Sequence, residues 1–175
     1  MTNFERTQWI STVVRVILAG IMLWAGLAKL LEPEQALRAV QAYRIFPPSI
    51  DDLVAIGLPI VEVAAGVLLL LGLGTRFAAW LTAGLMVLFI AGVASAWIRG
   101  LSIDCGCFGG GGDVPSGGEA ARYLTEIGRD LVFMGLAVWL IRFPKSRLSL
   151  DPLTDDIAVE IGQDDTDPDE VDETP

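Results

Sequence analysis

The chain has 175 residues, of which 53% are hydrophobic and 19% charged, and its mean hydropathy is +0.54. The formal net charge of −10 comes from the C-terminal end, because residues 149–175 hold eleven acidic residues and no basic one, whereas residues 1–148 balance at +1. This charge pattern offers no basic surface for nucleic acid. The lack of histidine and the presence of only two cysteines exclude histidine-ligated zinc or haem, and four-thiolate zinc or iron–sulfur sites, within one chain.

Four apolar stretches cover about residues 13–31, 53–73, 77–98 and 124–143. Each has about 20 residues, which at about 1.5 Å per residue crosses a hydrocarbon core of roughly 30 Å. The first stretch is long for a signal peptide, lacks a small-x-small cleavage site and ends in Lys29. We therefore expect an all-α integral membrane protein. It comprises an N-terminal segment 1–12, a bundle of four transmembrane helices within 13–148 and a disordered acidic tail 149–175.

The connections between these stretches differ in length and character. Glu34–Tyr43 has the pattern of a short amphipathic helix, and Pro47 and Pro48 stop any helix that follows it. The connection at Gly72–Arg76 is so short that the second and third helices must form an antiparallel hairpin. The third connection, about residues 99–123, holds both cysteines and eight glycines.

The two cysteines, Cys105 and Cys107, are separated only by Gly106. Bridged Cα atoms lie about 4.4–6.8 Å apart, so a disulfide here requires a bend, which glycine permits. Such a small ring closes almost no loop and adds little stability, and strained, exposed disulfides are the labile and catalytic ones. The pair is therefore interpreted as redox-active, against the alternatives of two ordinary thiols in a glycine-rich loop or a Cu(I) carrier. The carboxylate of Asp104 should disfavour a thiolate at Cys105, which favours Cys107 as the attacking thiol unless Arg99 or Arg122 folds over the loop.

Charged residues inside the apolar stretches form a second group of candidates. Glu62 lies near the middle of the second stretch, where a charge needs a partner inside the bundle, and Lys29 is a candidate partner. Arg129 and Asp130 open the fourth stretch, together with Glu126. These residues either form a polar cavity beneath the cysteines, which tunes a thiol or accepts protons, or an ion network that only holds the helices together.

Basic residues guide the topology, although six fall on each side of a four-helix arrangement. Arg76 lies in the shortest loop and Arg142, Lys145 and Arg147 cluster at one helix end, where positive charge most strongly favours the cytoplasm. We therefore expect a multi-pass plasma-membrane protein with both termini in the cytoplasm. The cysteine loop is then extracytoplasmic, where disulfides persist.

Several segments together resemble the MauE family of membrane proteins, which is related to the DoxX-like family. The segments that carry the resemblance are Ala25-Gly-Leu-Ala-Lys29-Leu30, Tyr43-Arg-Ile-Phe-Pro47, Pro59-x-x-Glu62-x-x-x-Gly66, Asp104-Cys-Gly-Cys-Phe-Gly109 and Arg129-Asp130. The resemblance covers about Val13 to Arg142 and implies a four-helix, redox-associated membrane protein. It also implies a link to maturation of methylamine dehydrogenase alongside a thioredoxin-fold, MauD-like partner.

These observations favour a membrane component of a thiol–disulfide relay, in which Cys105 and Cys107 exchange disulfides with an extracytoplasmic thioredoxin-like protein. Lys29, Glu62, Asp104, Arg129 and Asp130 would support the pair, without a metal. One cysteine pair must pass its electrons onward to a quinone or another protein, although no quinone motif is readable. The alternatives are a non-catalytic membrane scaffold for a partner oxidoreductase and a Cu(I) carrier, and the protein could form homo- or hetero-oligomers.

Overall fold

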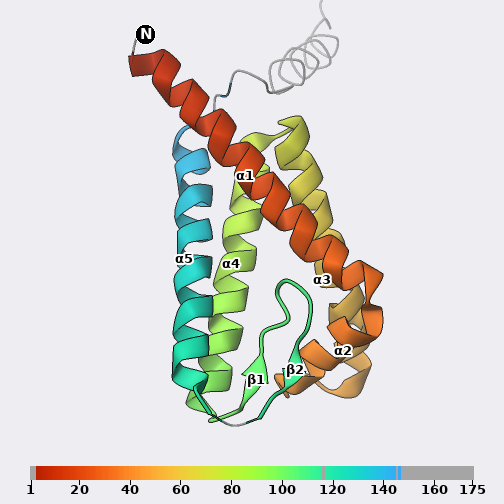
Figure 1. The fold of residues 1–175 in the computed structure, drawn as a ribbon. Helices are drawn as coiled ribbons and strands as arrows, with labels where there is room; N and C mark the ends of the chain where they lie inside the picture. The colour runs from red at the N-terminus through yellow and green to blue at the C-terminus, as the bar shows by residue number, and fades with distance from the viewer. Residues whose placement is uncertain (1–2, 116, 145, 147–175) are drawn as a thin grey trace, which may run out of the picture.

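The fold is helical, with one small two-stranded hairpin (Figure 1). The computed structural model describes residues 3–115, 117–144 and 146, so the predicted acidic tail 149–175 lies outside the described residues. The elements in chain order are α1 (Asn3–Leu31), α2 (Pro33–Ala42), α3 (Pro48–Leu71), α4 (Thr75–Ile98), β1 (Ile103–Asp104), β2 (Gly112–Asp113) and α5 (Glu119–Arg142). The short helix expected at Glu34–Tyr43 is confirmed as α2, and Gly72–Gly74 alone connects α3 to α4.

Three predicted helix starts were too late in the chain. The first helix begins at Asn3, so residues 3–12 belong to α1 and are not a separate N-terminal segment. α3 begins at Pro48 rather than near residue 53, because proline is well tolerated in the first turn of a helix. α5 begins at Glu119, directly after the glycines at 117 and 118. In each case the helix continues past its apolar part into polar residues, which hydropathy does not register.

In the part of the chain that the structure describes, three helices are long and apolar enough to cross a membrane, namely Glu5–Leu31, Pro48–Leu71 and Thr75–Ile98. Their outward surfaces carry large exposed hydrophobic side chains, such as Trp24, Ile60 and Trp80. α5 is as long as α3 but is not among them, because its first half contains several charged residues. Glu126 and Asp130 of α5 are nevertheless buried inside the protein. The outward surface of α5 exposes apolar side chains, including Leu124, Leu131, Val132 and Val138.

The helices pack as two main pairs, α1 with α3 and α4 with α5 (Figure 1). In the first pair the backbones approach closely at Gly26 and Gly66. A Cβ atom at Gly26 would lie 2.6 Å from the Val63 side chain, and one at Gly66 would lie 2.8 Å from Leu23. Small residues permit such contacts in lipid, where packing rather than hydrophobicity drives association. This close approach brings the end of α1, with Lys29, against the middle of α3.

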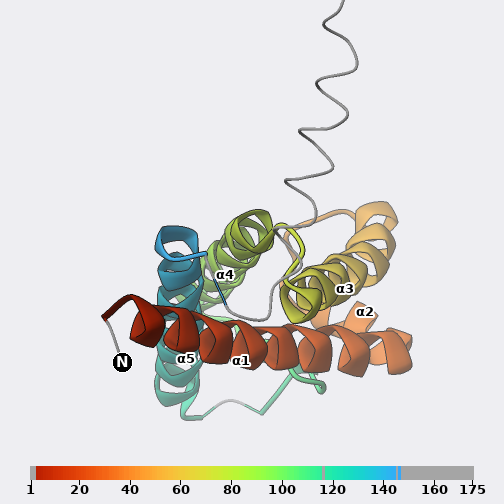
Figure 2. The same cartoon turned by 90° about the horizontal axis from the view of Figure 1, so that it is seen from above.

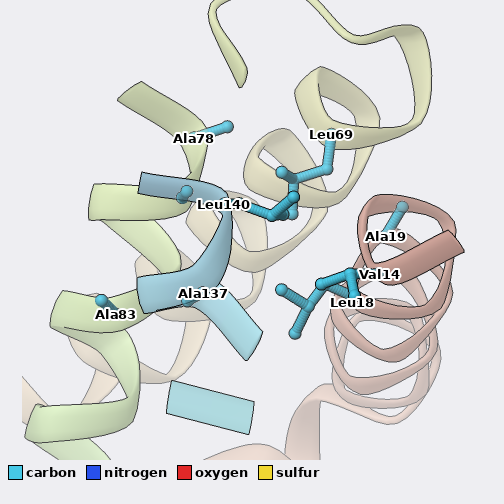
Figure 3. Close-up of a cluster of buried hydrophobic side chains, with 9 residues drawn as sticks. Val14, Leu18, Ala19, Leu69, Ala78, Ala83, Ala137 and Leu140 are labelled. Carbon is cyan, nitrogen blue, oxygen red and sulfur yellow. The ribbon is translucent and has the colours of Figure 1, made fainter. Parts of the chain in front are cut away.

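The two pairs meet in an apolar cluster at the end of the bundle away from the cysteines (Figure 3). α1 contributes Val14, Leu18 and Ala19, and the other three long helices contribute Leu69, Ala78, Ala79, Ala83, Ala137 and Leu140. α1 crosses the other long helices obliquely, as the view along the bundle shows (Figure 2). The helices diverge toward the opposite end, where α2 and the β-hairpin pack.

The β-hairpin fills this diverging end. β1 and β2 pair antiparallel, with Ile103 opposite Asp113 and Asp104 opposite Gly112. Tyr123 of α5 anchors β1, since its hydroxyl donates to the carbonyl of Leu101 and accepts the N–H of Ile103 at 3.2 Å. The loop between the strands, residues 105–111, rises from the strands into the space between the helices (Figure 1).

Candidate functional site: the cysteine loop

The loop that holds the two cysteines bends at Gly106, as the sequence predicted. Gly106 has φ +66°, a left-handed conformation that residues with a side chain rarely adopt. A Cβ atom there would also lie 2.7 Å from the Cβ of Ala39, and one at Gly111 would lie 2.5 Å from the same atom. The loop therefore rests directly on α2, and Gly106 is needed both for the bend and for this contact.

A buried ion pair fixes the loop to α1 and α3. The Nζ atom of Lys29 lies 2.9 Å from both carboxylate oxygens of Glu62 and donates to the carbonyl of Cys107, also at 2.9 Å. The Glu62 side chain is fully buried, and that of Lys29 is 10% exposed. The pairing expected from the sequence is confirmed. The ammonium group of Lys29 also connects α1 and α3 to the backbone of the cysteine loop.

α5 contacts the loop through Arg129. The guanidinium of Arg129 lies 3.9 Å from the sulfur of Cys105 and forms an ion pair with Asp130 at 2.9 Å. It also stacks over the ring of Phe108, with 4.8 Å between its central carbon and the ring centroid. Phe108 in turn packs edge-on against Phe133, which lies on α5 like Arg129. A planar cation is therefore held beside one of the two thiols.

The two thiols occupy different environments. Both are free in this structure, but Cys105 is partly exposed, whereas Cys107 is buried at 6% exposure. The backbone N–H of Cys107 donates to the sulfur of Cys105 at 3.3 Å. A hydrogen bond between the two thiols, this backbone donor and Arg129 lower the pKa of Cys105, against the opposing effects of burial and of the Glu126 carboxylate. The bond between the thiols and burial raise the pKa of Cys107. The geometry thus favours Cys105 as the thiolate, the reverse of the preference drawn from the sequence.

Asp104 has a different role from the one its position beside Cys105 suggested. Its Oδ1 atom accepts the backbone N–H of Gly106 at 3.0 Å, which stabilises the bend. Glu126 of α5 is the second carboxylate near the thiol: oxygen atoms of Asp104 and Glu126 and the sulfur of Cys105 all lie within 4.8 Å of one another. Of these three residues only Glu126 is buried, whereas Asp104 and Cys105 are partly exposed.

All the predicted site residues meet at the cysteine loop. Lys29 and Glu62 hold it from one side, Arg129 and Asp130 from the other, and Asp104 shapes it from within. Arg99, one of the two cations that would have reversed the choice of attacking thiol by folding over the loop, instead donates to the carbonyls of Tyr43 and Arg44. The sequence analysis did not identify Gln35, whose side-chain oxygen accepts the N–H of Gly110, or the roles of Ala39 and Phe108. None of these three contacts has a signal in local sequence.

Residues 7–143 match the family described as methylamine utilisation protein MauE, and this range includes every helix that contacts the loop. The chain belongs to the MauE family. A similar relative is "Methylamine utilization protein MauE" of Paracoccus denitrificans, with 34% identity over 112 residues. The aligned part covers 63% of this chain and 60% of that relative.

The fold of this MauE-family chain has no match among solved structures. Family membership and the three apolar helices together support a multi-pass membrane protein.

Proposed function

We propose that this protein is the membrane component of a thiol–disulfide relay that serves methylamine utilisation, with a thioredoxin-fold protein as its partner. The observation that carries the proposal is the asymmetry of the two thiols. Cys105 is partly exposed with Arg129 beside it, while Cys107 is buried against it in a loop that Lys29 and Gln35 hold in place. Family membership supports the pathway.

The exchange follows from this asymmetry. A thiolate of the reduced partner attacks the sulfur of Cys105 in the Cys105–Cys107 disulfide, and Cys107 leaves and takes up a proton. The second thiolate of the partner then attacks the mixed disulfide and expels Cys105 as a thiolate, which Arg129 stabilises. The partner is oxidised to its disulfide, and the cysteine pair is reduced to two thiols.

The proposal includes a fourth membrane span and an extracytoplasmic loop. α5 packs along α4, a candidate span of equal length. Its carboxylates at Glu126 and Asp130 are buried and most of its exposed side chains are apolar, so a bilayer can surround it. Four spans put both termini on one side, and the basic residues at 142–147 favour the cytoplasm for that side.

A variant with both cysteines changed to serine separates the relay from a scaffold. Cys105→Ser/Cys107→Ser should insert in the membrane at the level of the unchanged protein, because so small a ring contributes little to the fold. The double variant should nevertheless fail to restore growth on methylamine in a strain that lacks the gene. Full restoration by the double variant would overturn the relay and leave the scaffold, which needs no thiol.

A further inference from the structure

The structure contains an apolar cavity that the exchange reaction does not use. It lies between α3 and α4, has a volume of about 540 Å³, and is also lined by the segment that follows α2. Phe46, Leu53, Gly57, Leu85 and Phe89 line it, and Tyr43 is the one lining residue with a polar side chain. The volume is within the range of about 300–1,000 Å³ typical of small-molecule sites.

Two aromatic residues line this cavity and also lie near the thiol site. Tyr43 lines the cavity and packs against the same buried apolar cluster on which Cys105 packs. Phe89 lines the cavity and also a small space beside Cys107, Phe108 and Glu62. Burial and the nearby charge of Cys105 both raise the pKa of Tyr43, so its hydroxyl keeps its proton and acts as a donor.

The proposed relay needs a two-electron acceptor, because each exchange leaves Cys105 and Cys107 as thiols. We infer that the cavity binds a lipid-soluble quinone, which reoxidises the pair; this inference rests on the proposed function. The two membrane-spanning candidates α3 and α4 place the cavity where such a molecule is dissolved. The Tyr43 hydroxyl provides a donor for a quinone carbonyl at the wall nearest the thiols. An acyl chain alone would need neither the hydroxyl nor the neighbouring thiols.

The reaction balances. Two thiols and one quinone give one disulfide and one quinol: the S–H bonds of Cys105 and Cys107 break, an S–S bond forms, and two electrons and two protons pass to the two quinone oxygens. Cys105 supplies the thiolate, and Tyr43 positions the quinone head without changing its own state.

The test uses the full chain in phospholipid nanodiscs free of quinone, reduced and then separated from reductant. The probe is ubiquinone-1, whose fully substituted ring prevents direct addition of thiols. Quinol formation and loss of free thiols should rise together to one quinol per protein, with saturation in quinone. Gly57→Leu should raise the half-saturating quinone concentration about tenfold, which corresponds to roughly 1.4 kcal/mol. No atom lies within 4 Å of the Cβ position at Gly57, so the new side chain enters the cavity without a backbone clash.

Three further variants and one parallel measurement keep the result decisive. Gly84→Leu on α4 is the matched control, since its Cβ position is equally open and it does not line the cavity. Val61→Phe is a second filling variant, and Tyr43→Phe should raise half-saturation several-fold. These three variants and Gly57→Leu should all exchange disulfides with oxidised bacterial thioredoxin at the rate of the unchanged protein.

Each other outcome has a definite meaning. Normal thioredoxin exchange without quinol formation, or with quinol formation that neither filling variant changes, would overturn the quinone site and leave the relay intact. Loss of a co-purifying phospholipid from Gly57→Leu, with quinone reduction unchanged, would identify a lipid groove and also overturn it. Failure of the unchanged protein to exchange with thioredoxin would overturn the relay, and the quinone site with it.

Discussion

Replacing Lys29 tests whether the buried ion pair positions the cysteine loop or only joins helices. In Lys29→Met the fully buried carboxylate of Glu62 loses a cation that lies 2.9 Å from each of its oxygens, and the carbonyl of Cys107 loses a donor at 2.9 Å. Removing one partner of a buried pair costs about 3–5 kcal/mol, whereas replacing both by apolar residues is often neutral or stabilising. We expect Lys29→Met to lower the free energy of unfolding by about that amount, and Lys29→Met/Glu62→Leu to recover most of it.

The reactivity of Cys107 in the loop should not recover in the double variant, even though the free energy of unfolding does. Neither variant restores the donor to Cys107, so in a Cys105→Ala background Cys107 should be alkylated faster in both the single and the double variant. Unfolding would be followed by titration with denaturing detergent in mixed micelles, and alkylation by mass spectrometry. Arg38→Met is the control, because its pair with Glu34 is exposed and should contribute only about 0–1 kcal/mol. A double variant with unchanged Cys107 reactivity would refute the positioning role. If Lys29→Met lowers the free energy of unfolding no more than Arg38→Met does, the expected contribution of the buried pair to stability is wrong.

Three other predictions follow from the loop. Gly106→Ala should destabilise the loop more than Gly110→Ala does, because both glycines have positive φ but, of these two, only a Cβ atom at Gly106 meets Ala39. Limited proteolysis measures the difference, and equal sensitivity of the two variants would contradict this contact. Cys107→Ala removes the donor that lowers the pKa of Cys105, so the alkylation profile of Cys105 should move to higher pH, and a profile that stays in place would show that the hydrogen bond is unimportant. In intact cells, an impermeant maleimide should label reduced Cys105 but should label Arg76→Cys in a cysteine-free background only after lysis; the opposite pattern would invert the topology.

Most of the helices could be predicted from the hydropathy of the sequence, but fewer of the contacts at the candidate site could. Four apolar stretches predicted the four long helices, although hydropathy placed the starts of α1, α3 and α5 too late. Glu62 and Lys29 were paired correctly, because a charge within an apolar stretch needs a partner and few were available. The preference for Cys107 rested on the sequence neighbour Asp104, whose carboxylate accepts the backbone N–H of Gly106 in the structure. The cation that matters, Arg129, comes from a helix that begins only after the hairpin, and its approach to Cys105 depends on tertiary packing.

The same limit explains the other features that the sequence did not reveal. The sequence suggests only an interfacial aromatic residue at Tyr43, yet Tyr43 lines the apolar cavity and packs against the same cluster as Cys105. Ala39 reads as an ordinary helical alanine, yet its small size admits the loop at both Gly106 and Gly111. Contacts of this kind join segments far apart in the chain, and local patterns carry no record of them.

The most direct test of the relay is to trap its covalent intermediate. Reduced Cys107→Ser retains the partly exposed Cys105 but lacks the thiol that resolves a mixed disulfide, so incubation with an oxidised thioredoxin-fold protein should accumulate a covalent adduct on a non-reducing gel. Reduced Cys105→Ser should form much less adduct, because the remaining Cys107 is buried and its pKa is raised. Abundant adduct from Cys105→Ser and none from Cys107→Ser would reverse the assigned roles of the two cysteines. Absence of adduct from both variants would contradict the relay itself.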